Sequence, residues 1–347
     1  MKNKKIWLII LLLITLFLIF RISFSEKNLL REVASEKQFL IGASVSASPF
    51  LTDEKYKTTL KQEFNLLTIE NELKFSKVHP QRETYNFLIP DIIVDFAEEN
   101  KMKVRGHTLV WYHSNPDWLT NQTYSREEMI SILKGHIQTV VGHYKGKIYA
   151  WDIVNEAFNE DGTLRENIWL KTIGPEYIEL SFEWAHEADP NALLYYNDFN
   201  NERMNKKSDA IYKMVKNFKK RGIPIDGVGF QMHSSITYEK NYDQLKENFK
   251  RFEEINVDVQ ITEMDVKVQH SKDSYNERLN QQAKMYADTL DVCLSADNCS
   301  AFVTWGISDR YSWIPDYTGN EDFPLLFDED YQPKPSYDEI YHKLKEY

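Results

Sequence analysis

Two glutamates stand where strand-like runs of this sequence break into polar residues. Glu156 ends the segment 151–156, and Glu263 lies near the end of 259–265. A β-branched, apolar run that stops at a carboxylate predicts a side chain at the rim of a sheet and not in its core. Two such carboxylates on two strands suit acid/base and nucleophilic chemistry, above all at a glycosidic bond. The pattern therefore favours an enzyme.

Polar and aromatic residues also follow the other predicted strands. One such residue is usually an ordinary rim residue in a solvated hydrogen bond, but seven consecutive strand ends carry them, which points to a site. Carboxylates and amides supply the hydrogen bonds that sugar hydroxyls need, and indole rings cover the apolar faces of pyranoses. In chain order these residues are Glu70, Asn71 and Lys74; His107, Trp111, Tyr112 and His113; Asn155 and Glu156; Asn197 and Asp198; Gln231 and His233; Glu263 and Asp265; and Trp305, Asp309 and Trp313.

The elements that must position these residues alternate along the chain. Strands are expected at 39–45, 66–69, 103–108, 148–154, 193–196, 227–231, 258–262 and 301–305. Helices are expected at 91–100, 126–143, 175–188, 207–221, 242–254 and 275–294. Such alternation predicts an α/β protein, a single (β/α)8 TIM barrel, whose catalytic groups gather at the C-terminal strand ends. A doubly wound open sheet is the alternative, but no glycine-rich phosphate loop follows the first strand.

The N-terminus has the pattern of an export segment. Lys2, Lys4 and Lys5 precede the apolar run 6–20, and small residues follow at Ser23 and Ser25. The run is short for a membrane span, so residues 1–25 are predicted to be a signal peptide or a membrane anchor. Residues 26–38 are then a short stalk or a first helix, and 39–347 form the catalytic domain. Either alternative places the domain outside the cell, secreted or tethered to the outer face of the membrane.

Charge and cysteine content narrow the partners. The formal net charge is −11, which disfavours nucleic acid because phosphate binding requires a positive surface. The only cysteines, Cys293 and Cys299, predict one small-loop disulfide in an exported chain, with two buried thiols as the alternative. No histidine or cysteine cluster accompanies them, so neither a metal nor a cofactor is expected.

The motifs around these residues resemble glycoside hydrolase family 10, the endo-β-1,4-xylanases. The match runs in order from about residue 39 to 347, and its motifs together are highly specific. They are Glu70-Asn71-x-x-Lys74, the Gly-His-Thr-Leu-Val-Trp of 106–111, the Trp-Asp-Ile-Val-Asn-Glu of 151–156, the Gln-Met-His of 231–233, the Ile-Thr-Glu-Met-Asp of 261–265, the segment 304–313, and the closing 324–328 and 334–335.

The resemblance implies a role for each matched residue. Glu156 would be the acid/base and Glu263 the nucleophile of a retaining hydrolase, with His233 and Asp265 supporting Glu263. The remaining matched residues would bind substrate around the cleavage site, and a Cys293–Cys299 disulfide fits the same family. Those binding residues are Asn155, Gln231, Glu70, Asn71, Lys74, His107, Trp111, Trp305 and Trp313.

One segment departs from the family pattern. After Trp111 the family usually has His-Ser-Gln or His-Asn-Gln, whereas this chain has Tyr112, His113 and Ser114. The glutamine normally reaches a sugar on the glycone side. Weakened or altered glycone binding is therefore expected, with the chemistry intact because both glutamates remain.

Two other functions remain open beside an endo-xylanase acting on xylan and xylo-oligosaccharides. A related retaining β-1,4-glucanase would share every catalytic residue, because discrimination against glucose depends on space around one hydroxymethyl group. A non-catalytic glycan-binding barrel is disfavoured because such proteins usually lose a catalytic carboxylate. A monomer is expected, with membrane contact only through the N-terminal segment.

Overall fold

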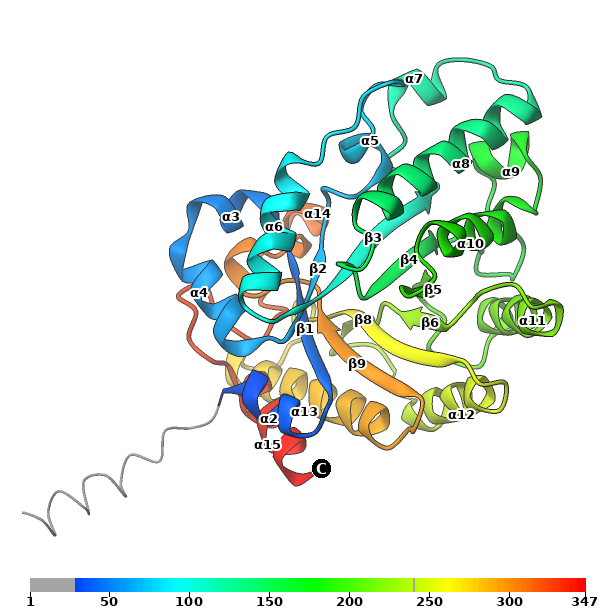
Figure 1. Ribbon diagram of the computed structural model, residues 1–347. Coiled ribbons are helices and arrows are strands. Elements are labelled where there is room, and N and C mark those ends of the chain that lie inside the picture. Colours follow the sequence, from blue (N-terminus) through cyan, green and yellow to red (C-terminus); the bar gives the residue numbers. More distant parts are fainter. Residues whose placement is uncertain (1–28, 240) are drawn as a thin grey trace, which may run out of the picture.

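Eight parallel strands close into a barrel with helices around the outside (Figure 1), as seen in a computed structural model that describes residues 29–239 and 241–347. Closure comes from two pairings, Leu40 beside Ala301 and Gly227 beside Asp258. The predicted (β/α)8 barrel is thus confirmed and the open sheet is excluded. The described residues form nine strands, and all but β7 belong to the barrel. In chain order they are β1 Leu40–Val45, β2 Leu66–Ile69, β3 Lys103–Trp111, β4 Ala150–Asn155, β5 Leu193–Asp198, β6 Gly227–Phe230, β7 His233–Ser235, β8 Asp258–Lys267 and β9 Cys299–Thr304.

The long helices of the described residues cover the barrel, and α8, α11, α12 and α13 begin at side-chain caps. A capping box forms at Ser125, with its hydroxyl accepting from the Glu128 N–H (3.2 Å). Ser274 caps the 20-residue helix α13 in the same way. The helices are α2 Leu30–Glu36, α3 Ala47–Thr52, α4 Glu54–Glu63, α5 Phe75–Val78, α6 Leu88–Glu99, α7 Asp117–Thr120, α8 Arg126–His143, α9 Ile168–Thr172, α10 Tyr177–Ala188, α11 Lys206–Arg221, α12 Tyr242–Glu253, α13 Tyr275–Leu294, α14 Ile314–Thr318 and α15 Pro335–Glu346, with a 3₁₀ turn at Asp309–Tyr311.

The strand boundaries differ from the prediction at the mouth of the barrel. The sixth strand was expected to reach Gln231, but β6 ends at Phe230 because Met232 adopts a left-handed backbone (φ +63°) that breaks the run. The chain then resumes as β7, which pairs with an extension of β8 beyond the barrel and sets His233 beside Asp265. This pairing fixes two of the predicted site residues in register.

The barrel interior contains a buried polar layer. The Arg105 guanidinium on β3 is fully buried and donates to Asp152 on β4 and to Gln260 on β8. Gln260 in turn donates to the Tyr195 hydroxyl (3.0 Å). A buried cation must be compensated by acceptors, and these hydrogen bonds tie β3, β4, β5 and β8 together below the site.

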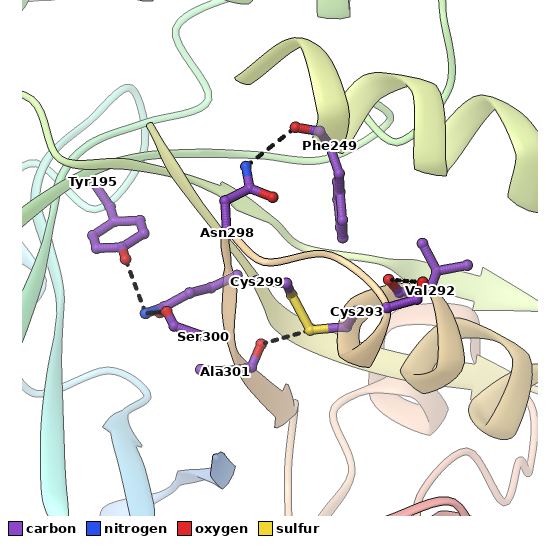
Figure 2. Close-up of a disulfide and its surroundings, with 10 residues drawn as sticks. Tyr195, Phe249, Val292, Cys293, Asn298, Cys299, Ser300 and Ala301 are labelled. Carbon is purple, nitrogen blue, oxygen red and sulfur yellow. Dashed lines mark hydrogen bonds between the residues drawn. A yellow bond between two sulfur atoms is a disulfide. The ribbon is translucent and has the colours of Figure 1, made fainter. Parts of the chain in front are cut away.

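Cys293 and Cys299 form a disulfide that joins the end of α13 to the start of β9 (Figure 2). Their Cα atoms are 5.2 Å apart, a usual separation for a disulfide. Beside it, the Asn298 side chain donates to the Phe249 carbonyl (3.1 Å) and so links this turn to α12. The alternative of two free thiols is therefore excluded.

The segment before the first strand is partly described. Residues 30–36 form helix α2, whose Leu30 and Ala34 are fully buried, so this part of the lead-in packs on the barrel. The predicted signal or anchor of residues 1–25 lies outside the described residues. Among residues 29–239 and 241–347, no helix is long and apolar enough to cross a membrane.

A stack of aromatic rings behind the site contains two buried histidines. His79 and His136 face each other with their Nδ1 atoms 3.3 Å apart, and the Phe75 ring lies parallel to His136 at 3.6 Å. One ring must offer a lone pair to the other, because two N–H groups cannot share this contact. Burial, and then the neighbouring His79, holds the pKa of His136 well below its ordinary value.

We expect this pair to make the fold less stable in acid. His136 stays neutral in the fold but binds a proton when unfolded, so its stabilisation is complete above about pH 6.5 and is lost as the pH falls below it. Between pH 7.5 and 5.5, the free energy of unfolding of the wild type should fall by about 1 kcal/mol more than that of a His136→Phe variant. Urea unfolding at both pH values measures this. The control His186→Gln removes an exposed histidine, and an equal pH dependence in wild type and His136→Phe would contradict the prediction.

Candidate active site

The two glutamates lie at the same mouth of the barrel and are joined by a chain of amides. Glu156 follows β4 and accepts at Oε1 from the Gln231 and Asn155 side chains (3.0 and 3.2 Å). Glu263, on β8, accepts at Oε1 from the Asn197 amide (2.6 Å), which also donates to the Asn155 oxygen (3.0 Å). Both carboxyl groups are almost fully buried. The structure therefore brings them into one hydrogen-bonded site.

Glu263 is held as a carboxylate by histidine. His233 Nε2 lies 3.3 Å from Glu263 Oε2, and His233 Nδ1 lies 2.9 Å from Asp265. Burial by itself favours neutral His233, but Asp265 and Glu263 outweigh it and raise the pKa of His233 to about 10. Burial likewise opposes the charge of Glu263, yet the hydrogen bond from His233 and the charge of His107 leave the pKa of Glu263 below its ordinary value. The arrangement is suited to a charged nucleophile.

Glu156 sits on a strained turn. Its backbone is left-handed (φ +58°), a conformation that costs a residue with a Cβ roughly 1–3 kcal/mol. Several hydrogen bonds hold it there: its N–H donates to the Asn197 carbonyl (2.9 Å), and Arg165 Nε donates to its carbonyl (3.1 Å). The turn aims the carboxyl group back toward the amides of Asn155 and Gln231.

His107 connects the site to the buried layer below it. Its Nδ1 lies 2.9 Å from Asp152, the same carboxylate that pairs with Arg105, and 3.9 Å from Glu263 Oε1. Trp305 meets the His107 ring edge-on at 5.2 Å. The imidazole is thereby fixed in orientation beneath the reacting groups.

Three polar residues after β2 form one linked group at the side of the site. Asn71 donates to Glu70 (2.9 Å), Lys74 donates to Asn71 (2.8 Å), and the Lys74 ammonium lies 5.1 Å from the centre of the Trp111 ring. Burial lowers the pKa of Lys74, although the charges of Glu263, Glu70 and Glu156 oppose this. The group offers donors and acceptors beside an indole, as a sugar subsite requires.

Two tryptophans cover the opposite side. Trp313 donates its indole N–H to Asp265 (2.8 Å), and its ring centre lies 5.2 Å from that of His233. Trp305 lies between this pair and His107, 6.4 Å from the His233 ring. The predicted catalytic and substrate-binding residues are thus gathered at this mouth. Two of the polar strand-end residues are not: the carboxyl groups of Asp198 and Asp309 pair with Lys207 and Lys334 instead.

The sequence pattern predicted that Asn197 is a polar residue at the end of a strand, but it indicated no specific role for it. Its side chain bonds both Asn155 and Glu263, and it accepts from Thr262 (2.7 Å) as well. Gly229 on the next strand makes room for it, because a Cβ there would lie 2.1 Å from Asn197 Oδ1. The sequence signal for this contact was Gly229, a glycine on the strand next to that of Asn197.

The segment 112–114, which departs from the family pattern, lies beside Glu156 and Trp111. The Tyr112 ring is 4.4 Å from the Arg165 guanidinium, which also holds the Glu156 carbonyl, and His113 is exposed at 5.2 Å from the Trp111 ring. Ser114 adopts a left-handed backbone (φ +54°), and its carbonyl accepts from the Ser76 N–H (2.7 Å). Tyr112, in place of the histidine usual in the family, thus adds a cation–π contact with Arg165 behind the turn that carries Glu156, the acid-bearing turn.

No group of three or more histidine, cysteine or acidic side chains in the described part of the chain is arranged to hold a metal ion. The site consists of carboxylates, amides, imidazoles and indoles at the mouth of the barrel, a set that can protonate a leaving group and attack a carbon.

Comparison with known proteins gives this arrangement a family. The profile of glycosyl hydrolase family 10 matches residues 29–343. The chain is 46% identical to endo-1,4-beta-xylanase B of Thermotoga neapolitana over 84% of each chain, and 41% identical to a beta-1,4-xylanase of Dictyoglomus thermophilum over 98% and 99%. Its fold matches the crystal structure of xylanase 10B from Thermotoga petrophila in complex with xylobiose (TM-score 0.89, 44% identity, 92% and 97% covered). The chain belongs to glycosyl hydrolase family 10 and is a glycoside hydrolase.

Proposed function

We propose that the chain is an endo-1,4-β-xylanase that hydrolyses internal β-1,4 linkages of xylan with retention of configuration. The observation that carries this function is the pair of buried glutamates in one amide network, of which Glu263 alone is bonded to a histidine of raised pKa. Relatives named as xylanases, and a similar structure that binds xylobiose, support xylan as the substrate over β-1,4-glucan. Retention of both carboxylates disfavours a non-catalytic barrel.

In the first step Glu263 attacks the anomeric carbon while Glu156 gives its proton to the departing glycosidic oxygen. Only Oε1 of Glu156 has hydrogen-bond donors among residues 29–239 and 241–347, so Oε2 is available to carry that proton. The product is a glycosyl–Glu263 ester and a free sugar hydroxyl. In the second step Glu156 takes a proton from water, which attacks the same carbon and releases Glu263.

The remaining residues bind the sugars around this bond. Asn155 and Gln231 would contact the attacked sugar, while His107, Trp305 and Trp313 enclose it. Glu70, Asn71, Lys74 and Trp111 would hold sugars on the non-reducing side, where the linked polar group and the indole lie next to each other. His233 and Asp265 act through Glu263 by keeping it charged and oriented.

We further propose that residues 1–25 export the protein as a signal peptide or anchor, and that it acts outside the cell as a monomer. The basic residues before the apolar run 6–20 support this location. Fractionation of cells that express the full chain tests it: xylanase retained inside the cytoplasm would contradict export.

Removing either glutamate should sharply slow xylan hydrolysis, because each acts in a different part of the reaction. Glu263→Ala should lower kcat/KM on xylan about 10⁴-fold or more, and Glu156→Ala about 10²–10⁴-fold. Reducing-sugar release from xylan and from cellulose by the full chain measures this, with the exposed Glu127→Ala as the control. Added azide should give a β-glycosyl azide with Glu156→Ala and an α-azide with Glu263→Ala, because it enters the face that each side chain vacates. Full activity in either variant would refute the assignment.

The acid limb of activity should depend on His233. Glu263 must be ionised to attack, and His233 lowers its pKa, so His233→Asn should raise the pKa of Glu263 and move the acid limb of kcat/KM to higher pH. His233 itself stays charged over this range, since its pKa lies near 10. Profiles on xylotriose measure the shift, with the exposed His342→Asn as control. An unmoved limb would show that His233 does not set the charge of Glu263.

The segment after Trp111 should limit glycone binding. A Ser114→Gln variant restores the amide that the family usually carries there, and Ser114 already has the left-handed backbone that glutamine would inherit. We expect a higher kcat/KM on short xylo-oligosaccharides, where glycone contacts are few, and little change on xylan. Steady-state kinetics against xylotriose and xylan check this, and no gain on the short substrate would overturn it.

A further inference from the structure

Behind the acid-bearing turn lies a buried ionic chain that the reaction does not touch. The Tyr196 hydroxyl donates to Asp198 Oδ2 (2.5 Å), and Lys207 Nζ on α11 lies 2.8 Å from Asp198 Oδ1. All three side chains are fully buried. Buried ions are costly, so their presence requires a compensating structural reason.

The chain ends on the backbone that carries Glu156. The Ala157 N–H donates to the Tyr196 hydroxyl (2.9 Å), while the preceding Glu156 N–H donates to the Asn197 carbonyl (2.9 Å). Consecutive N–H groups of the strained turn are therefore both bonded by β5. The hydroxyl can accept from Ala157 in this direction because its own proton is committed to Asp198.

The ion pair with Lys207 favours the ionised form of Asp198 against the effect of burial, and this form fixes the orientation of the hydroxyl. Burial raises the pKa of Asp198 to about 7, while Lys207 and the Tyr196 hydroxyl oppose the rise. A hydrogen bond to a carboxylate is stronger than one to a neutral acceptor, so it restricts rotation of the hydroxyl more tightly. Lys207 also reaches Glu160 (3.2 Å), three residues beyond Ala157, and so ties the same loop a second time.

Strand geometry separates this chain from the nucleophile. Successive side chains of β5 point to opposite faces, so Tyr196 and Asp198 face the helices while Asn197 between them faces Glu263. Loss of the Tyr196 hydroxyl therefore frees the Glu156 turn without removing any hydrogen bond of Glu263.

We propose that Tyr196, backed by Asp198 and Lys207, is a positioning residue that aims Glu156 for proton transfer. The inference rests on the proposed function, in which Glu156 is the acid/base. It assigns no direct contact with substrate to the three residues. Proton transfer is steeply sensitive to such aim, since a displacement of about 1 Å can cost 100-fold.

The leaving group provides the test. A xylo-oligosaccharide leaves as a poor alkoxide and needs the proton of Glu156, whereas 2,4-dinitrophenolate leaves from an aryl β-xylobioside without one. For both substrates kcat/KM reports only the steps up to formation of the glycosyl–enzyme. Tyr196→Phe should therefore lower kcat/KM about tenfold or more on xylotetraose and less than about twofold on the aryl xylobioside.

A matched control separates position from stability. Tyr144 is also buried and donates its hydroxyl to a carboxylate, Asp91 (2.9 Å), but directly after the end of α8 and away from the site. Tyr144→Phe should leave both kcat/KM values unchanged. Asp198→Asn is a second variant, which should show the same selective loss as Tyr196→Phe.

The outcomes are distinct. A selective loss on xylotetraose supports the inference, whereas equal losses on both substrates, or no loss on either, overturn it. A wild-type chain that cleaves neither xylan nor xylotetraose would instead refute the proposed function, before any variant is compared.

Discussion

The constraint on which the site depends is the burial of carboxylates at the mouth of a closed barrel. A carboxylate removed from water needs hydrogen-bond donors or an opposite charge beside it, and each buried aspartate here has a different pair of partners. Asp152 lies between Arg105 and His107, Asp265 between His233 and Trp313, and Asp198 between Lys207 and Tyr196. The first two sets of contacts fix His107, His233 and Trp313 around the place where a sugar would lie. The interactions that stabilise the buried carboxylates therefore also orient the groups of the site.

The same constraint gives the two glutamates different environments. Glu263 is approached by His233 and His107 and keeps its charge at a lowered pKa. Among the described residues, the Glu156 carboxyl group accepts hydrogen bonds only from side-chain amides and only at one oxygen. Its backbone has a left-handed conformation. Two chemically identical side chains are thereby prepared for opposite tasks, one to attack and one to exchange a proton.

Much of the fold could be predicted because its signals are local. Alternating strand-like and helix-like runs located the eight predicted strands and the six predicted helices to within a few residues. The strand errors that bear on the site lie at the mouth, where strand pairing beyond the barrel overrides local pattern: β8 continues to Lys267 because β7 pairs with it, and Met232 ends β6 early. The stacked histidines His79 and His136, 57 positions apart, left no local trace either.

By itself, the sequence determined which residues reach the site, because a polar residue that follows an apolar strand is carried to the rim in any closed barrel. Its motifs also determined the family. Only the tertiary structure decided which of these groups pair: Asn197 with Glu263, 66 positions away, and Tyr196 with the turn at Ala157, 39 away. Such pairs depend on barrel closure and strand register, which set distances to within a hydrogen bond and which no stretch of sequence contains.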